Sequence, residues 1–208
     1  MVWFLELVDY GYERNKTVFG APYDFRFAPH SLTSYFECLR ALIESASARN
    51  SGRKVVLVSH SMGGLVSIYF LRRQSQQWKD RYVASLVTLA TPWSGSTLML
   101  RAMTSGYAFE VPLLDSLIVR AQQRSSEVAP LLLPRAPAWQ PHDVLIQTPA
   151  VNYTTASYHQ WLDDIGFPLG KEMLQNVQTD DYRLEHPGVH MYCWYGTGRC
   201  LHLHVHVR

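Results

Sequence analysis

Two runs of apolar, β-branched residues mark the most regular part of the chain. The first covers residues 55–58 (VVLV) and is followed by an amphipathic pattern over residues 65–74. The second covers residues 82–89 (YVASLVTL) and ends in a loop that contains Pro92 and Gly95. Short runs of this kind are typical of strands that are buried on both faces of a parallel sheet. The alternation of strand and helix therefore predicts an α/β fold with a mostly parallel sheet.

The segment before these runs predicts two further elements. Residues 17–23 (TVFGAPY) are typical of a short strand that runs into a Gly/Pro turn. Residues 29–50 carry apolar side chains at helical spacing, with Ser31 as the expected N-cap. Cys38 lies within that helical pattern, so we expect it to be a small core residue.

The second half of the chain follows a different pattern from the core expected over residues 1–95. Residues 96–185 contain seven prolines and alternate short apolar stretches with loops, which predicts a cap-like insertion. Residues 186–198 contain the strand-like HMYCWY, and we expect them to return to the core. The last ten residues, 199–208, continue no pattern and have no predicted place.

Composition narrows the class of protein. The chain has 208 residues, of which 47% are hydrophobic and 17% charged, so it is long enough for one core with an insertion. This balance excludes a disordered tail and a collagen-like chain, and three unevenly spaced cysteines argue against a disulfide set. The net charge of +2 is too small to predict nucleic acid as the main partner. No apolar run approaches the ~20 residues of a membrane span, and the first residues lack the pattern of a secretory signal.

The sharpest chemical signal lies between the first strand and the helix after it. There the sequence S-H-S-M-G, residues 59–63, places small residues two positions before and two positions after Ser61. This spacing, with Ser59 where Gly is commoner, is typical of a nucleophile elbow, a strained turn that exposes a serine between strand and helix. We expect Ser61 Oγ to attack an acyl carbonyl, with the backbone N–H of Met62 as one oxyanion donor. The alternative is a tight βα turn whose serine has no function.

Four stretches of the chain carry a resemblance to one family. They are GAPYDFR at 20–26, VVLVSHSMGG at 55–64, LATPWSGS at 89–96 and PGVHMYCWYGTG at 187–198. Together they resemble the lecithin:cholesterol acyltransferase family, which includes enzymes of the lysosomal phospholipase A type. The sequence TPAVNYTTASYHQWLDDIGF at 148–167 is similar to the plant-like branch of that family.

The resemblance implies an α/β-hydrolase fold, a Ser-Asp-His triad with Ser61 as the nucleophile, and phospholipid or another acyl lipid as donor. It implies no cofactor and no metal, and it is compatible with action at a membrane or lipoprotein surface. Trp93, in the third stretch, is expected to lie at the rim of an acyl pocket. Full-length relatives are secretory, lysosomal, vacuolar or membrane-associated, which leaves the compartment of this chain open.

The resemblance is incomplete at both ends. In this family the catalytic Asp and His lie beyond the Tyr-Gly-x-Gly stretch, which ends here at Gly198 and is followed by RCLHLHVHVR. We expect this ending to be out of frame or unspliced. The early strands of the sheet, the second oxyanion donor and the export signal or anchor of the family lie upstream of the first residue. A sheet without its early strands leaves an unpaired apolar edge, so we expect the chain alone to aggregate or to be marginally folded.

Other histidines are weaker substitutes for a missing base. Three of them follow Ser61 in a workable order: His142 beside Asp143, His159 near Asp163, and His186. None of the three follows a strand as the fold requires. In the tail, three histidines alternate and would share one face of a strand, like the ligands of a metal ion: His202, His204 and His206. Accidental composition explains these tail residues better than a metal site does.

The sequence therefore favours a lipid O-acyltransferase or phospholipase that acts through an acyl-Ser intermediate at Ser61. One alternative is a truncated, non-catalytic chain that binds lipid without turnover. Another is a serine esterase that acts on soluble esters.

Overall fold

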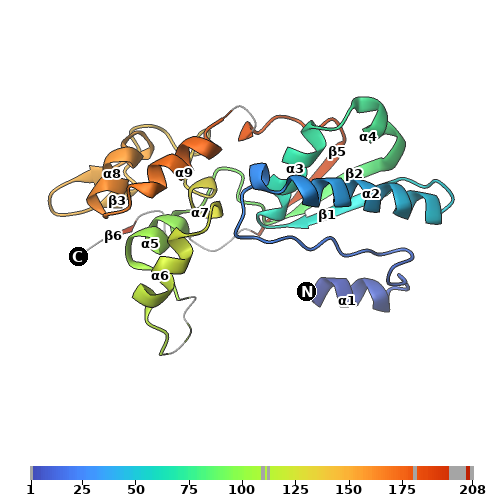
Figure 1. Ribbon diagram of the computed structural model, residues 1–208, viewed down its shortest axis with the longest axis horizontal. Coiled ribbons are helices and arrows are strands. Elements are labelled where there is room, and N and C mark those ends of the chain that lie inside the picture. Colours follow the sequence, from blue (N-terminus) through green and yellow to red (C-terminus); the bar gives the residue numbers. More distant parts are fainter. Residues whose placement is uncertain (1, 109–110, 112, 180–181, 197–204, 207–208) are drawn as a thin grey trace. The chain divides into compact units, whose positions relative to one another are not determined.

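The computed structural model describes residues 2–108, 111, 113–179, 182–196 and 205–206 (Figure 1). The chain forms two compact units, which are described here one at a time. Unit 1 consists of Met1–Phe25, Pro29–Thr91 and Glu185–Tyr195. Unit 2 consists of Arg26–Ala28, Pro92–Leu184 and Gly196–Arg208.

Unit 1 contains a parallel three-stranded sheet with the order β1-β2-β5. The strands are β1 (Val55–His60), β2 (Val83–Leu89) and β5 (His190–Trp194). Their carboxyl ends are aligned, because His60 pairs with Leu89 and Leu89 pairs with Trp194. The prediction of an α/β fold with a parallel sheet is confirmed.

Helices of unit 1 pack against β1 and β2 of this sheet (Figure 1). They are α2 (Thr33–Arg49), α3 (Gly63–Arg72) and α4 (Gln76–Tyr82), and the unit also holds α1 (Val2–Asp9) and the 3₁₀ helix η1 (Pro29–Ser31). Phe70 of α3 joins them, because its ring stacks on Phe36 of α2 at 5.8 Å and meets Trp78 of α4 edge-on at 5.7 Å. The patterns did not predict α4, which begins after Ser75, whose hydroxyl accepts the Trp78 N–H at 3.2 Å.

Unit 2 consists of short helices and a small sheet. The helices are α5 (Thr97–Ser105), α6 (Ser116–Arg124), α7 (Val128–Leu131), η2 (Thr155–Ser157), α8 (Tyr158–Asp164) and α9 (Leu169–Val177). The sheet has the order β4-β3-β6, with β3 (Ile146–Gln147), β4 (Asn152–Tyr153) and β6 (Val205–His206). Residues 26–28 belong to this unit because Ser126 Oγ donates to the Arg26 carbonyl at 3.0 Å and the Ala28 N–H donates to Glu127 at 3.0 Å.

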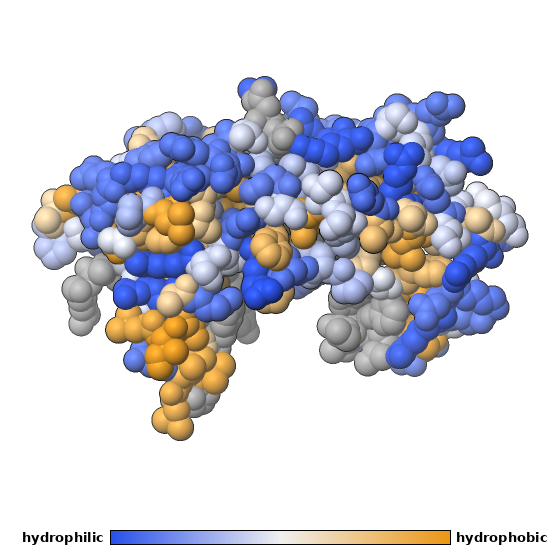
Figure 2. All heavy atoms as spheres, in the orientation of Figure 1, coloured by the Kyte–Doolittle hydropathy of each residue, from blue (hydrophilic) through white to orange (hydrophobic). Residues whose placement is uncertain are grey.

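The surface of unit 2 carries an aliphatic patch over α6 and the loop before it (Figure 2). Its members are all exposed: Val111, Leu113, Leu114, Leu117 and Ile118. No side chain of α6 is buried, so the patch is not covered within the described part of the chain. Such a cluster is larger than the single exposed apolar residues that soluble proteins ordinarily carry.

Several local predictions are wrong. Residues 17–23 form no strand, because the chain turns at 13–17, where Thr17 Oγ1 accepts the Glu13 N–H at 2.7 Å, and only an isolated bridge pairs Arg14 with Val18. Ser31 is not the N-cap of α2, because it ends η1, and Leu32 takes that position without a capping side chain.

Two predictions of burial are also wrong. Cys38 is exposed, because it lies next to the buried stripe of α2 that contains Leu39 and Ile43 and is turned away from it. Strand β1 is not buried on both faces, since Val56 is 51% and Val58 39% exposed.

Among the described residues, no helix is long and apolar enough to cross a membrane.

Candidate active site

Ser61 lies at a sharp turn between β1 and α3. Its backbone has φ +53°, a left-handed conformation that non-glycine residues rarely adopt. Two hydrogen bonds hold the turn: the Ser61 N–H donates to the Leu89 carbonyl at 2.8 Å, and the Gly64 N–H donates to the Ser61 carbonyl at 3.1 Å. The strand, turn and helix thus have the arrangement of a nucleophile elbow, with a strained serine at its apex.

A hydroxyl pair ties the strand of the elbow to its helix. Ser59 Oγ of β1 and Ser67 Oγ of α3 are 2.7 Å apart, and either hydroxyl can donate. The pattern at 59–63 shows why Ser59 is small, but the partner Ser67 was missed. Its signal was the one polar residue in the apolar run L-V-S-I-Y-F-L that begins at Leu65.

Close packing of β2 against α3 fixes the position of the elbow. A Cβ built on Gly64 would overlap the side chain of Thr91, which follows β2. Ala90, which lies between the end of β2 and Thr91, also has a left-handed backbone at φ +49°. Its N–H donates to the Trp194 carbonyl at 2.8 Å. Backbone hydrogen bonds thus join the carboxyl ends of β1, β2 and β5 at the turn that carries Ser61.

Helix α3 begins directly behind Ser61. Met62 occupies its N-cap position with a buried side chain, and the Met62 carbonyl accepts the Val66 N–H at 3.1 Å. The first N–H groups of a helix and its dipole favour negative charge at this end. The Met62 N–H is therefore suited to stabilise an oxyanion that forms on a carbonyl attacked by Ser61.

The GAPYDFR stretch of the sequence brings a tyrosine to the elbow. A Cβ built on Gly63 would lie 3.8 Å from the Tyr23 hydroxyl and 3.7 Å from Ser59 Cβ. Burial raises the pKa of Tyr23, and burial together with the nearby Tyr23 raises the pKa of Tyr35 to about 12. The Tyr35 hydroxyl donates to the Ala21 carbonyl at 3.2 Å, which holds this stretch in place. Both phenols therefore stay protonated at neutral pH.

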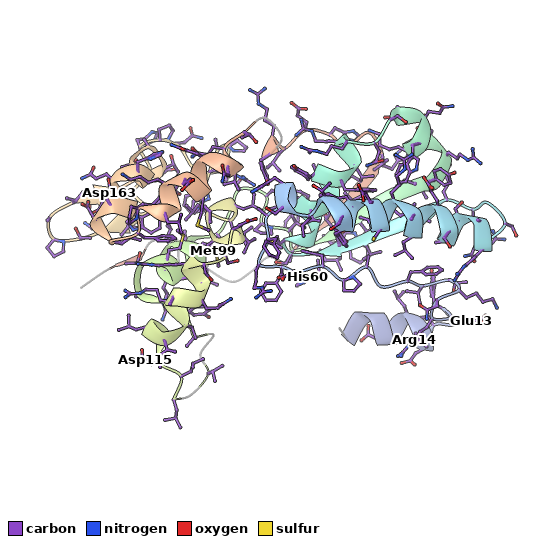
Figure 3. All side chains as sticks on the ribbon, in the orientation of Figure 1. Glu13, Arg14, His60, Met99, Asp115 and Asp163 are labelled. Atoms are coloured by element: carbon purple, nitrogen blue, oxygen red, sulfur yellow. The ribbon has the colours of Figure 1, made fainter. Side chains whose placement is uncertain are left out.

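None of the predicted substitutes for the base is bonded to Ser61. The Ser61 hydroxyl has no hydrogen bond to an imidazole in the part of the chain that the structure describes. His60 is exposed at the end of β1 (Figure 3). His186 precedes β5, at the amino-terminal end of the parallel strands, and its Nδ1 accepts the Gly188 N–H at 3.1 Å. Ser61 follows the carboxyl end of β1, so His186 lies at the opposite end of the strands.

The other two candidates lie in unit 2, where their carboxylates have other roles. Asp143 accepts the Gln140 N–H at 2.7 Å, and its distance to the exposed His142 imidazole is 3.9 Å. Asp163, one turn after the exposed His159, pairs with Lys171 instead. Neither histidine is therefore held by its neighbouring carboxylate in the way a catalytic base is.

The predicted pocket residue Trp93 lies in unit 2, half-buried in the loop between β2 and α5. Two other aromatic side chains of unit 2, Trp161 and Phe167, are buried in its core. No group of three metal-ligating side chains occurs among the described residues. The tail histidines His202 and His204 fall outside the described residues, so the structure does not test them.

The family model of lecithin:cholesterol acyltransferase matches residues 1–187, which is most of the chain. The chain belongs to the lecithin:cholesterol acyltransferase family. It is 45% identical to a lysosomal phospholipase A and acyltransferase of Bos taurus over 92% of this chain and 47% of that protein. It is 40% identical to a phosphatidylcholine-sterol acyltransferase of Gallus gallus over 92% of this chain and 46% of that protein. The chain thus spans about half the length of the curated relatives that it matches.

A solved structure also aligns with this chain. A chain in the crystal structure of the Tle4–Tli4 complex matches with a TM-score of 0.47 and 16% identity, over 82% of this chain and 39% of its own length.

Proposed function

We propose that Ser61 is the nucleophile of a lipid O-acyltransferase or phospholipase. The observation that carries the proposal is the left-handed backbone of Ser61 at the β1–α3 junction. A serine is strained in this way where the turn must present its hydroxyl above the sheet. Family membership supports the same chemistry.

The reaction follows from the elbow. Ser61 Oγ bonds to the ester carbonyl carbon of a lipid, and the oxyanion is stabilised by the Met62 N–H and the N-terminus of α3. The ester C–O bond then breaks, the proton lost by the Ser61 hydroxyl passes to the leaving lipid alcohol, and the acyl group remains on Ser61. Transfer to a second alcohol gives an acyltransferase, and transfer to water gives a phospholipase.

The relatives support phospholipid as the acyl donor. Their names specify a phospholipase A with acyltransferase activity and an enzyme that uses phosphatidylcholine and a sterol. The exposed aliphatic patch of unit 2 supports action at a lipid surface, because clustered aliphatic side chains partition into the boundary of a bilayer. From the resemblance to the family, we also propose that unit 2 is the cap and that Trp93 is a residue of the pocket rim.

A fluorophosphonate probe tests the nucleophile. The probe phosphonylates only activated serines, so we expect labelling of the native chain and no labelling of Ser61→Ala. The matched control is Ser34→Ala, which changes an exposed serine of α2 and should label as the native chain does. Labelling of Ser61→Ala at the native level would overturn the assignment.

A second candidate function is lipid binding without turnover. The observation that favours it is that the Ser61 hydroxyl has no imidazole partner among the described residues. Binding to phosphatidylcholine vesicles with no labelling of Ser61 would establish it in place of the enzyme. Labelling together with faster hydrolysis of soluble short-chain esters than of vesicles would instead favour an esterase.

A further inference from the structure

A side-chain hydrogen bond spans the elbow of unit 1. Ser59 Oγ, near the end of β1, lies 2.7 Å from Ser67 Oγ, in the second turn of α3, and the bond is partly buried. The two residues flank Ser61 in the sequence, two positions before it and six after it. All three belong to unit 1. The pair therefore joins the strand before the turn to the helix after it.

Ser67 shares a face of α3 with the first glycine of that helix. Gly63 lies four residues before Ser67, and positions four apart are neighbours on one face of a helix. A Cβ built on Gly63 would lie 3.7 Å from Ser59 Cβ, so Ser59 lies against this same face. The Ser59 side chain is thus packed beside the first turn of α3 and hydrogen-bonded to the second.

The backbone conformation of Ser61 depends on restraints of this kind. A serine at φ +53° is strained, and it stays in that conformation only where the surrounding structure holds it. One restraint comes from β2, where the Leu89 carbonyl accepts the Ser61 N–H, and another lies within the turn, where the Gly64 N–H donates to the Ser61 carbonyl. The Ser59–Ser67 bond adds a third, because it limits how far α3 can move away from the end of β1.

We propose that Ser67 is a positioning residue for the nucleophile Ser61, an inference that rests on the proposed function. The Ser67 hydroxyl is bonded to Ser59, so it acts through β1 and α3 and not on the substrate. By holding these two elements together, it fixes the position of Ser61 Oγ relative to the first N–H groups of α3, which attack on a carbonyl requires. Ser59 stands where glycine is commoner in an elbow, and Ser67 supplies the partner for its additional hydroxyl.

The rate at which a fluorophosphonate labels Ser61 measures this effect. Ser67→Ala removes one hydroxyl and suits the helix, and we expect it to slow labelling about fivefold, as the loss of one ordinary hydrogen bond permits. The matched control is Ser75→Ala, which removes the N-cap of α4, a hydroxyl that accepts the Trp78 N–H at 3.2 Å in the same unit. This control should lower the thermal midpoint without slowing labelling. Native labelling of Ser67→Ala, or equal slowing in Ser75→Ala, would overturn the proposal.

A double-mutant cycle shows whether the two hydroxyls act as a pair. Ser59→Ala keeps a small residue at the position where the elbow needs one. If the hydroxyls act only through their bond, Ser59→Ala and Ser67→Ala slow labelling by the same factor, and the double variant is no slower than either. If the two single effects multiply in the double variant, the hydroxyls act independently and the bond is not the cause.

Hydrogen exchange separates this inference from the function on which it rests. The Ser61 and Gly64 N–H groups are both bonded at the turn, so their exchange reports opening of the elbow whether or not the serine reacts. Mass spectrometry of peptides that cover residues 58–66 should show about fivefold faster exchange in Ser67→Ala and native exchange in Ser75→Ala. If the native chain is not labelled but exchange is faster in Ser67→Ala, the enzyme proposal fails while Ser67 still holds the elbow. If exchange is not faster, Ser67 does not hold the elbow, whatever the probe shows.

Discussion

Gly64, rather than Gly63, is the glycine on which the elbow depends. Both positions satisfy the small-residue pattern of the sequence, yet their surroundings differ. A Cβ on Gly63 would make ordinary contacts at 3.7 Å with Ser59 Cβ and 3.8 Å with the Tyr23 hydroxyl. A Cβ on Gly64 would overlap three side-chain atoms of Thr91, including its Cβ, which no rotamer change can move away.

We therefore expect Gly64→Ala to destabilise the chain by about 1–3 kcal/mol, the usual effect of overpacking. Gly63→Ala should change stability by less than ~1 kcal/mol, because alanine is a better helix former and the space is available. The midpoint of thermal unfolding measures both. Adding Thr91→Gly to Gly64→Ala removes the overlapping atoms, so a failure of this second change to restore any stability would contradict the steric explanation.

Residue patterns located the serine at the apex of the elbow but not the residues that support it. Ser61 and Met62 could be placed from S-H-S-M-G because the strain of an elbow demands small residues at fixed spacing. The Ser59–Ser67 pair and the overlap of Gly64 with Thr91 depend on how β2 and α3 approach each other, which no local pattern encodes. Ser31 was placed wrongly for the same reason, since the 3₁₀ helix η1 moves the N-cap of α2 by one residue, from Ser31 to Leu32.

At the scale of elements, side chains of α4 hold the loop that precedes β5. Lys79 Nζ, on a buried side chain, donates to the Pro187 carbonyl at 2.9 Å, and Gln76 Nε2 donates to the Gly188 carbonyl at 2.8 Å. These bonds join segments more than 100 residues apart in the chain. They fix the loop from which β5 enters the sheet beside β2.

Lys79→Met keeps the aliphatic stem and removes the ammonium, so it leaves the Pro187 carbonyl without its donor. We expect a loss of about 1.5–3 kcal/mol in the free energy of unfolding, as for other hydrogen bonds to charged groups. Urea denaturation gives this value directly. Lys171→Met, which breaks a partly exposed pair with Asp163, should lose less than ~1 kcal/mol. Equal losses in the two variants would show that the buried Lys79 bond stabilises the fold no more than the partly exposed Lys171 pair does.

The contact between α2 and α4 should make stability depend on pH. The Trp78 indole N–H donates to Glu44 at 2.7 Å, and this bond is the main cause of a lowered Glu44 pKa, with Arg40 contributing at 3.0 Å. A lowered pKa means that the ionised Glu44 stabilises the folded state above its unfolded pKa of about 4.3, and that this contribution is lost as pH falls through the folded value.

We expect the thermal midpoint of the native chain to exceed that of Glu44→Gln at pH 7, and the difference to shrink on acidification below about pH 4. Glu37→Gln changes an exposed carboxylate on the same helix and serves as the control. Thermal scans at several pH values between 3 and 7 measure the effect. A difference between the native chain and Glu44→Gln that stays constant over this range would contradict the assignment.

For the whole molecule, the sequence indicated the class of fold but not its division into units. The β-branched runs predicted β1 and β2 because buried parallel strands need that composition. Residues 26–28 of unit 2 are bonded to Ser126 and Glu127, about 100 residues away, and such contacts leave no local signal. The burial of β1 was overestimated, because an apolar run reports what a strand can bury and not which neighbours cover it.

The uncovered face of the sheet in unit 1 leads to a prediction about association. Val58 pairs in register with Val87, and Val87 with Tyr192, so their side chains lie on one face. Val58 and Tyr192 are 39% and 55% exposed, and Trp194 on the same face is 66% exposed. The alternate residue Ser59 faces α3, which places this apolar surface on the side opposite that helix. Exposed apolar sheet surfaces of this kind favour pairing between chains.

We expect the 208-residue chain to self-associate as its concentration rises, and Val58→Lys to weaken this association by at least about tenfold, since a buried unpaired ammonium opposes contact. Sedimentation velocity over a hundredfold range of concentration measures it. The control is Leu169→Lys, which changes an exposed apolar residue on α9 of unit 2 and should associate as the native chain does. If the native chain remains monomeric and unfolds cooperatively, the exposed sheet face does not drive association. If Leu169→Lys weakens association as much as Val58→Lys, the contact does not lie specifically on the sheet.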